Sequence, residues 1–217
     1  MKRLIRWAFF FIGMLIFSLG ITMTINVQHL GIHPWDVLNV ALYHTFGMTI
    51  GSWNIIVSIT LVLISMMIDR RYIKFGTLIN AVFIGLFVDI FMWLDFLPHA
   101  TYSLLDVGIM LLGIAVMGVG GGMYNAGGVG SGPRDGFMLS LSDKTGLSIQ
   151  KVRIIVETSV LVIGFIIGGP VFLFSLIFTF IQSPIFQYSY QLFGKWLVRL
   201  DEKLEARKRL IAKQKSC

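Results

Sequence analysis

Residues 26–57 read NVQHLGIHPWDVLNVALYHTFGMTIGSWNIIV, and residues 125–156 read NAGGVGSGPRDGFMLSLSDKTGLSIQKVRIIV. The two stretches align without a gap at a constant offset of 99 residues, and ten of the 32 positions are identical. A chain of this composition gives about three identities by chance, so the second stretch is interpreted as an internal repeat of the first. The shared core is Gly-x-x-Pro-x-Asp, then a short apolar segment, then Gly-x-Thr/Ser-Ile.

The composition places this repeat in a lipid bilayer. Of the 217 residues, 56% are hydrophobic and 13% charged, whereas a soluble domain carries about 25% charged residues. We therefore predict an all-α polytopic membrane protein. The apolar run at the N-terminus continues to Val27 without a small-residue cleavage site, so it is interpreted as a first span and not as a signal peptide. Six transmembrane helices are expected, at 7–27, 50–68, 75–94, 104–126, 149–168 and 170–192.

Lysine and arginine are distributed so as to predict the orientation of these spans. The N-terminus, the connections 69–74 and 127–153 and the C-terminal tail are basic, whereas 28–49, 95–103 and the turn near 168–170 carry neither residue. Basic segments stay on the cytoplasmic side, so both termini are expected there. The net charge of +7 is assigned to loops and tail, and no nucleic-acid partner is expected.

Two segments between the spans, 34–46 and 133–145, are too short to cross the hydrocarbon. Each is predicted to form a short broken or re-entrant helix with a proline at its first position. Each copy then holds three spans and one short helix, and because three is odd the second copy enters the membrane upside down. The predicted units are two inverted three-helix repeats, 1–97 and 98–194, followed by a basic cytoplasmic tail helix, 195–217. That tail is expected either to lie on anionic lipid or to dock a partner protein.

The helix breaks before the two short helices are the predicted functional site, because irregular backbone inside a membrane is tolerated where it is buried in protein or lines a cavity. Ionisable and amide side chains within spans are candidates for lining the same path. The helix-break residues are Gly31, Pro34, Gly130, Gly132 and Pro133. The candidates for a substrate or ion path are Asn26, Asp36, Asn80, Asp89, Asn125, Arg134, Asp135, Glu157 and Gln182.

Several of these residues admit a second interpretation. The two aspartates are third in their short helices and are equally expected to cap their own backbone amides. Arg134, which stands where the first copy has Trp35, is expected to pair with Asp135, hold an anionic group, or only enforce topology. The polar groups within spans are expected either to line the path or to form helix–helix hydrogen bonds.

Three further relations are expected around the spans. Glu157 is expected to pair with Arg153, one turn away. A shift of six residues in the third span would place Asp89 opposite Gln182. The glycines between 113 and 122 are predicted to form a face for close helix packing.

The sequence offers no support for an enzyme. It contains neither a nucleophile–base pair nor a metal-ligand spacing, the four histidines are scattered, and the single cysteine is Cys217. No Gly-rich loop precedes a Lys-Ser/Thr pair, so no nucleotide site is predicted. We expect no catalytic residue, metal or cofactor.

The repeat motifs resemble a bacterial family. The segments Gly31–Asp36, Gly47–Trp53 and Gly76–Asn80, followed by Gly85 and Asp89, are similar to the YczE-type group within the YczE/YyaS/YitT membrane proteins. The segments 130–135 and 145–149 are similar to the second half of that family, and the resemblance covers about 5–195. It implies a multi-pass protein of the bacterial cytoplasmic membrane and little about chemistry. Related YitT-type proteins often carry a soluble C-terminal domain, and because the basic tail stands in that place here, we do not expect the function of that domain to carry over.

Two functions are weighed on these observations. The first is a small secondary transporter or channel for an unknown solute or ion, with its site between the two Pro-x-Asp breaks. The second is a non-transporting accessory or substrate-binding subunit that docks a partner membrane protein or forms a homo-oligomer.

Overall fold

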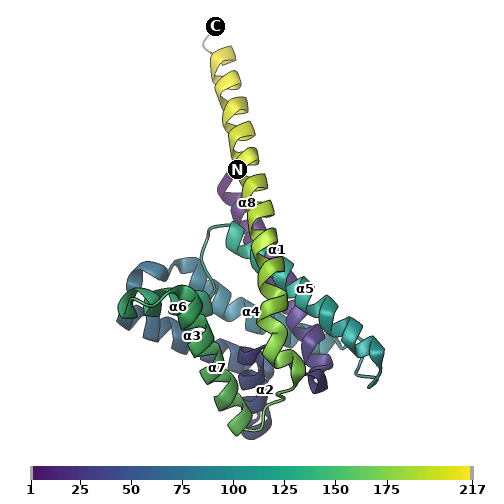
Figure 1. Ribbon diagram of the computed structural model, residues 1–217. Coiled ribbons are helices and arrows are strands. Elements are labelled where there is room, and N and C mark those ends of the chain that lie inside the picture. Colours follow the sequence, from purple (N-terminus) through teal and green to yellow (C-terminus); the bar gives the residue numbers. More distant parts are fainter. Residues whose placement is uncertain (1, 216–217) are drawn as a thin grey trace.

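The computed structural model describes residues 2–215, and every regular element among these residues is helical (Figure 1). The elements are α1 (Lys2–Asn26), the 3-10 turn η1 (Gln28–Leu30), α2 (Pro34–Phe46), α3 (Ile50–Ile68), the 3-10 turn η2 (Arg70–Tyr72), α4 (Phe75–Leu94), α5 (Leu104–Ala126), α6 (Pro133–Thr145), α7 (Ile149–Ile166) and α8 (Leu173–Lys215).

Local signals set the bounds of the two short helices, which match the predicted ranges 34–46 and 133–145. A proline begins each helix, since its fixed φ suits the first turn and its missing N–H has no helical partner there. Gly47 and Gly146 end them with φ of 75° and 71°, the left-handed backbone that glycine adopts without strain. The shared Gly-x-Thr/Ser-Ile motif is therefore a turn that stops one helix and starts the next. Its Thr49 or Ser148 side chain accepts a hydrogen bond from a backbone amide of the following helix.

Four helices are long and apolar enough to cross a membrane: α1, α3, α4 and α5. The other two predicted spans, 149–168 and 170–192, coincide with α7 and the first half of α8. Charges interrupt α7 at Lys151, Arg153 and Glu157. The all-helical membrane class is thus confirmed, and a crossing by the last two helices stays a prediction.

Helices α1 and α5 form the most extensive contact in the fold. Glycines permit it, as the small residues between 113 and 122 predict. A Cβ atom on Gly120 would lie 2.4 Å from the Phe17 nitrogen, and one on Gly13 would lie 2.5 Å from the Tyr124 nitrogen. The two backbones therefore touch directly, and the core of Phe10, Met14 and Met117 surrounds this line of contact.

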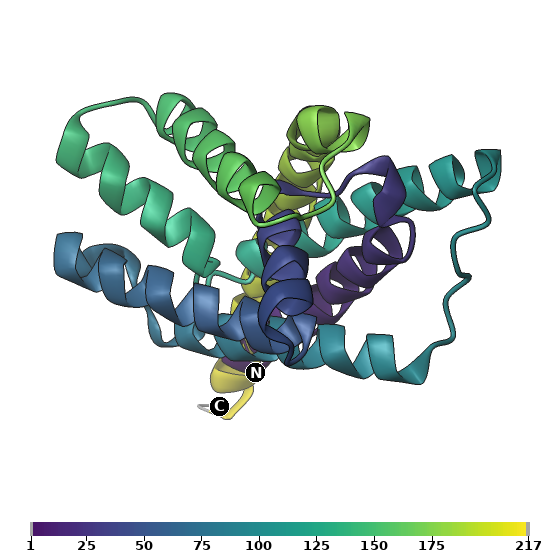
Figure 2. The ribbon, with the colours of Figure 1, turned by 90° about the horizontal axis from the view of Figure 1, so that it is seen from below.

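The short helices exchange partners between the two copies. Helix α2 packs on α7 of the second copy, and α6 packs on α3 of the first. Figure 2 shows α6 lying between α3 and α7 in this group. Within each copy, the third span packs on the first, α4 on α1 and α8 on α5. Equivalent helices thus have equivalent neighbours.

Each break contacts the first turn of the third span of the other copy, which is α8 for the first break and α4 for the second. A Cβ on Gly31 would lie 2.7 Å from the Ser175 hydroxyl oxygen, and one on Gly130 would lie 2.5 Å from the Thr77 nitrogen and 2.6 Å from the Gly76 carbonyl carbon. These contacts make Ser175 the counterpart of Gly76, again at an offset of 99. The predicted six-residue shift, which set Asp89 opposite Gln182, is therefore wrong. The connections 69–74 and 167–172 have equal length, so no residues are missing before α8.

The equivalence fails at one pair of helices. Helices α3 and α4 pack closely, and a Cβ on Gly51 would lie 2.1 Å from the carbonyl oxygen of Gly85. Helices α7 and α8 make hardly any backbone contact and diverge from their connection at 167–172 (Figure 1). The first copy is closed where the second is open.

The basic tail continues α8 without interruption through Lys215, and this long helix projects beyond the rest of the molecule (Figure 1). Arg6 of α1 forms an ion pair with Asp201 at 2.7 Å, and Leu197 is buried. Residues 216–217 of the predicted tail lie outside the described range, and the structure does not test lipid or partner contact.

Candidate functional site

The two predicted helix breaks meet through an ion pair at the start of α2 and α6. The Nη2 atom of Arg134 lies 3.3 Å from Oδ1 of Asp36, whose side chain is 1% exposed. The same guanidinium lies over the Trp35 ring, 5.4 Å from its centroid, a distance typical of a cation–π contact. Of the alternatives for Arg134, the structure supports neither pairing with Asp135 nor a free loop position, since the arginine bridges the two breaks.

A second group of charges lies beside the first. Arg153 of α7 is 3.3 Å from Asp135 Oδ1 and, through its Nε atom, 3.9 Å from Glu157 Oε1. The predicted Arg153–Glu157 pair is therefore present, with the arginine shared between two acids. Thr179 of α8 donates a hydrogen bond of 2.8 Å to Glu157 Oε2. Side chains from α2, α6, α7 and α8 thus converge on one region.

The capping interpretation of the two aspartates is not supported. Among the described residues, Asp36 is bonded by Arg134 and Asp135 by Arg153, and neither accepts a bond from an amide of its own helix. The N-cap of α2 is His33, whose Nδ1 accepts from the Trp35 nitrogen at 3.4 Å. The Asp36 carboxylate is consequently directed at the opposite copy, whereas the Asp135 carboxylate pairs within its own copy.

The region contains buried polar atoms without a hydrogen-bond partner. Within the described part of the chain these are Asp36 Oδ2, Trp35 Nε1, Asn39 Oδ1, Asn80 Nδ2 and Arg153 Nε, together with Gln28 Oε1 near η1. Leaving such a group unpaired costs about 1–3 kcal/mol. Those of Trp35, Asp36, Asn80 and Arg153 lie at the two breaks or next to them, and this concentration is typical of a site organised for function more than for stability.

Sequence analysis missed four members of the site: His33, Tyr124, Arg153 as a shared partner, and Thr179. Tyr124 is 5% exposed and lies beside Asn80 and Asn125. Its counterpart in the first copy is Ile25, and the counterpart of Thr179 is Asn80. A search for polar residues of one copy that stand at apolar positions of the other would have found Tyr124.

A polar cavity of about 470 Å³ reaches Asp135 and Arg153 from the side that carries η2. Its polar lining is Arg71, Tyr72, Lys74, Asn125, Ser131, Asp135, Arg153, Gln187 and Tyr190. Met138, Leu139, Ile149 and Phe186 add apolar surface, and Gly128 and Gly130 contribute backbone. Both α7 and α8 supply walls, so the cavity occupies the opening that α3 and α4 close in the first copy.

Ion pairs and hydrogen bonds order the rim of the polar cavity. Tyr72 donates a hydrogen bond of 2.6 Å to Asp143 of α6, and this bond raises the pKa of the Tyr72 hydroxyl above its ordinary value. Hydrogen bonds from Arg71 lower the pKa of Asp69. Arg71 also lies 3.4 Å from Asp143, so the rim joins the α3–α4 connection to α6.

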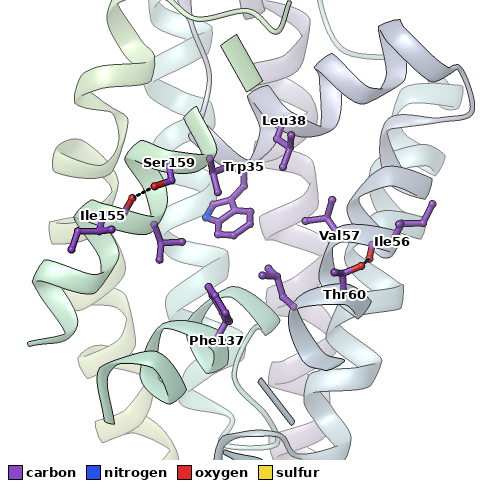
Figure 3. A pocket seen from close by; sticks show the side chains of 11 residues that line it. Trp35, Leu38, Ile56, Val57, Thr60, Phe137, Ile155 and Ser159 are labelled. Atoms are coloured by element: carbon purple, nitrogen blue, oxygen red, sulfur yellow. Dashed lines mark hydrogen bonds between the residues drawn. The ribbon is translucent and has the colours of Figure 1, made fainter. Parts of the chain in front are cut away.

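A second cavity, of about 410 Å³, is almost wholly apolar (Figure 3). It lies among α2, α3, α6 and α7, and Trp35 stands in its middle (Figure 3). Its lining is paired at the repeat offset: Leu38 with Phe137, Ile56 with Ile155, Val57 with Val156, Thr60 with Ser159 and Leu61 with Val160. The Thr60 and Ser159 hydroxyls donate to carbonyls of their own helices, so they offer the cavity no free donor.

Of the other predicted path residues, Asn125 lines the polar cavity and Asn26, Asp89 and Gln182 lie outside both cavities. Asn26 donates to the Pro98 carbonyl at 3.5 Å, and Asn125 donates to the Gly121 carbonyl while lining the polar cavity. Asp89 accepts from the Thr49 hydroxyl at 2.6 Å and the Gly51 amide at 2.8 Å. It therefore joins α3 to α4, outside both cavities. Gln182 is half-buried on α8.

The described residues contain no group of three histidine, cysteine, aspartate or glutamate side chains placed to hold a metal ion. The chemistry that the arrangement supports is reversible: exchange of ion-pair partners, hydrogen bonding to a solute, and uptake of a proton by a carboxylate.

Comparison with known proteins places these features in a family. The family described as "Family of unknown function (DUF6198)" matches residues 4–190. The uncharacterized membrane protein YczE of Bacillus subtilis is 34% identical over 188 residues, 87% of this chain and 86% of that protein. The uncharacterized protein YyaS of the same bacterium is 32% identical over 169 residues, 76% of this chain and 83% of that protein. An uncharacterized protein of Haemophilus influenzae is 32% identical over 181 residues, 82% of each chain. No solved structure matches the chain. The resemblance seen in the two motifs is thereby confirmed.

Proposed function

The chain belongs to the DUF6198 family, and on that premise we propose that it is a small secondary transporter with its solute site where the two Pro-x-Asp breaks meet. One observation carries the proposal. The ion-paired side chains of the two breaks lie beside a polar cavity that is lined by Asp135 and Arg153 and opens on the side that carries η2. A channel would need a path open at both faces, whereas a transporter exposes its site to one face at a time.

The two copies are proposed to be related by inversion across the membrane. The repeat offset, the exchange of partners between α2 and α6, and the reciprocal seating of Gly31 and Gly130 support this relation. The distribution of lysine and arginine supports cytoplasmic termini in a bacterial membrane. Sites between inverted repeats with broken helices are typical of secondary transporters.

The difference between α3–α4 and α7–α8 supports a transport cycle. In an inverted repeat, the conformation of one copy is the conformation that the other reaches in the opposite state. We expect the molecule described here to be open toward the side of Arg71 and Lys74, which the positive-inside rule assigns to the cytoplasm. Closing α8 on α7 while α4 leaves α3 would expose the same charges to the other face.

An accessory role is the second candidate, and the projecting end of α8 favours it. A helix that extends beyond the rest of the molecule offers a surface for a partner protein. No catalytic activity is proposed for either role.

The test is transport by purified protein in liposomes. Single amino acids, small carboxylic acids, sugars and inorganic ions are offered one at a time, and counterflow of each labelled compound is measured. We expect one class to exchange in wild type and Asp36→Asn to abolish exchange. Asp95→Asn is the control, since Asp95 lies in an exposed left-handed turn that asparagine also accepts.

Absence of counterflow for every compound, combined with copurification of a partner through residues 195–215, would replace the transporter proposal with the accessory role. Equal exchange by wild type and Asp36→Asn would contradict the placement of the site.

A further inference from the structure

The charges around the two breaks do not balance. The region holds three carboxyl groups, of Asp36, Asp135 and Glu157, and two guanidinium groups, of Arg134 and Arg153. Asp36 pairs with Arg134 and Asp135 pairs with Arg153, each at 3.3 Å. Glu157 shares Arg153 with Asp135 at the longer distance of 3.9 Å, so the region has one carboxyl group in excess.

Glu157 has the weakest contact with a cation of the three. Its oxygen lies 3.9 Å from Arg153 Nε, beyond hydrogen-bond distance, and its side chain is 13% exposed. The close contact it makes is the 2.8 Å hydrogen bond from Thr179. An unbalanced negative charge in a membrane interior is costly, and a bound proton removes that cost.

The comparison of the two copies separates Glu157 from the residues that build the fold. Its counterpart in the first copy is Ser58, a buried residue of α3 whose side chain is not ionisable. Helix α3 packs on the two short helices with serine at this position, as α7 does with glutamate, so that packing does not require a carboxyl. An acid present in one copy alone is placed there for a function of the second copy.

The charged and titratable groups that face Glu157 come from every helix packed around it. Helix α6 contributes Arg134 and Asp135, and α7 contributes Arg153. The break before α2 contributes His33, which lies within the range of electrostatic interaction with Arg134 and Arg153. The neighbouring group from α8 is the uncharged Thr179.

We propose that Glu157 is the proton-binding residue that couples the transport cycle to a proton gradient. The proposal rests on the transport function proposed above and names its coupling ion. A proton from water in the polar cavity forms an O–H bond on the carboxylate, and the group loses its charge. The same proton leaves to water on the opposite face after the site has changed sides.

The hydrogen bond between Glu157 and Thr179 links proton binding to movement. It joins α7 to α8, the two helices that lack the close packing seen between α3 and α4. A neutral Glu157 gives α7 and α8 an interface without an unpaired charge, which favours their closure. An ionised Glu157 favours access to the water of the cavity.

Infrared spectroscopy of the purified protein in liposomes tests the proposal without any transported solute. A protonated carboxyl group gives a C=O stretching band separate from that of a carboxylate. At neutral pH we expect wild type to show this band for one group per chain, and Glu157→Gln to lose it. Asp143→Asn, which changes an acid at the exposed rim, is the control and should leave the band unchanged.

A second variant guards against a folding defect in Glu157→Gln. Thr179→Val removes the hydroxyl that bonds Glu157 while keeping the shape of the side chain. It should shift the frequency of the band without removing it. A wild-type spectrum without the band, or a band that Glu157→Gln does not affect, overturns the proposal.

Sodium supplies the other decisive outcome. If added NaCl, compared with choline chloride at equal concentration, converts the Glu157 signal to that of an ion-bound carboxylate, the coupling ion is sodium and the proton proposal fails. None of these spectra depends on counterflow, so the transport function can stand when the proton site falls, and a confirmed proton site does not by itself establish transport.

Discussion

At the scale of single residues, the ion pair between Arg134 and Asp36 joins the two copies at their centre. Both groups are largely removed from solvent, with side chains 18% and 1% exposed. Such a pair adds little compared with apolar residues of the same size, but breaking it leaves one buried charge uncompensated.

We therefore predict that Arg134→Leu destabilises the protein by about 3–5 kcal/mol. The measurement is thermal unfolding of the detergent-solubilised protein. The double variant Arg134→Leu with Asp36→Asn should recover most of the loss, because it removes both charges. A double variant as unstable as Arg134→Leu alone would show that the pair is not the source of the effect.

Glycine at position 31 gives a second prediction at this scale. Its φ is +92°, and a Cβ there would meet Ser175 of α8 and Phe172 of the preceding connection at less than 3 Å. Gly31→Ala is expected to lower stability by about 1–3 kcal/mol, through strain and a displaced helix start. Gly108→Ala is the matched control: it lies within α5 with no atom near its added Cβ and should be neutral or stabilising. Equal effects of the two variants would argue against a tight seat for the break.

At the scale of helices, much of the fold follows from local sequence. The bounds of α2 and α6 were predictable because proline at the first position and glycine after the last act within their own turns. Charge asymmetry between connections predicts the orientation of the spans, and that orientation stays a prediction. These signals need no knowledge of what packs against the helix.

Contacts between the copies were not predictable in this way. Gly76 and Ser175 occupy equivalent places, yet they share no identity that would align them, and α4 and α8 were paired with the wrong shift. Arg134 was weighed with its neighbour Asp135, while the structure pairs it with Asp36, 98 residues away. Periodicity and composition describe one helix at a time, whereas the site depends on which helices meet.

Asp89 makes the α3–α4 contact testable. It accepts hydrogen bonds from the Thr49 hydroxyl and the Gly51 amide at the start of α3. Asp89→Ala should leave these donors unpaired, at a cost of about 1–3 kcal/mol. Hydrogen exchange of the amides near Gly51 should then be roughly tenfold faster or more. Asp95→Ala, in the exposed connection, should not change exchange there, and unchanged protection in Asp89→Ala would mean that the carboxylate does not hold the helices together.

At the scale of the whole molecule, each copy is completed by the other. The short helix of each copy packs on the second span of the other copy, α2 on α7 and α6 on α3. The break of each copy contacts the third span of the other copy, α8 or α4. A movement of α8 relative to α7 therefore acts on the Gly31 break directly, through Phe172 and Ser175. Because the same helices form the walls of the polar cavity, a change of access and a change at the ion pairs are parts of one motion.

This account requires the two copies to have opposite orientations, which cysteine labelling can test. In a Cys217→Ser background, Thr45→Cys and Lys144→Cys place thiols at the exposed ends of α2 and α6, which are equivalent positions at the repeat offset of 99. With three spans between them, a membrane-impermeant maleimide added to intact cells should label position 45 and reach position 144 only after the membrane is opened. The odd number of crossings between the two positions makes the result unequivocal. Labelling of both positions from outside, or of neither, would place the copies in the same orientation and remove the basis for alternating access.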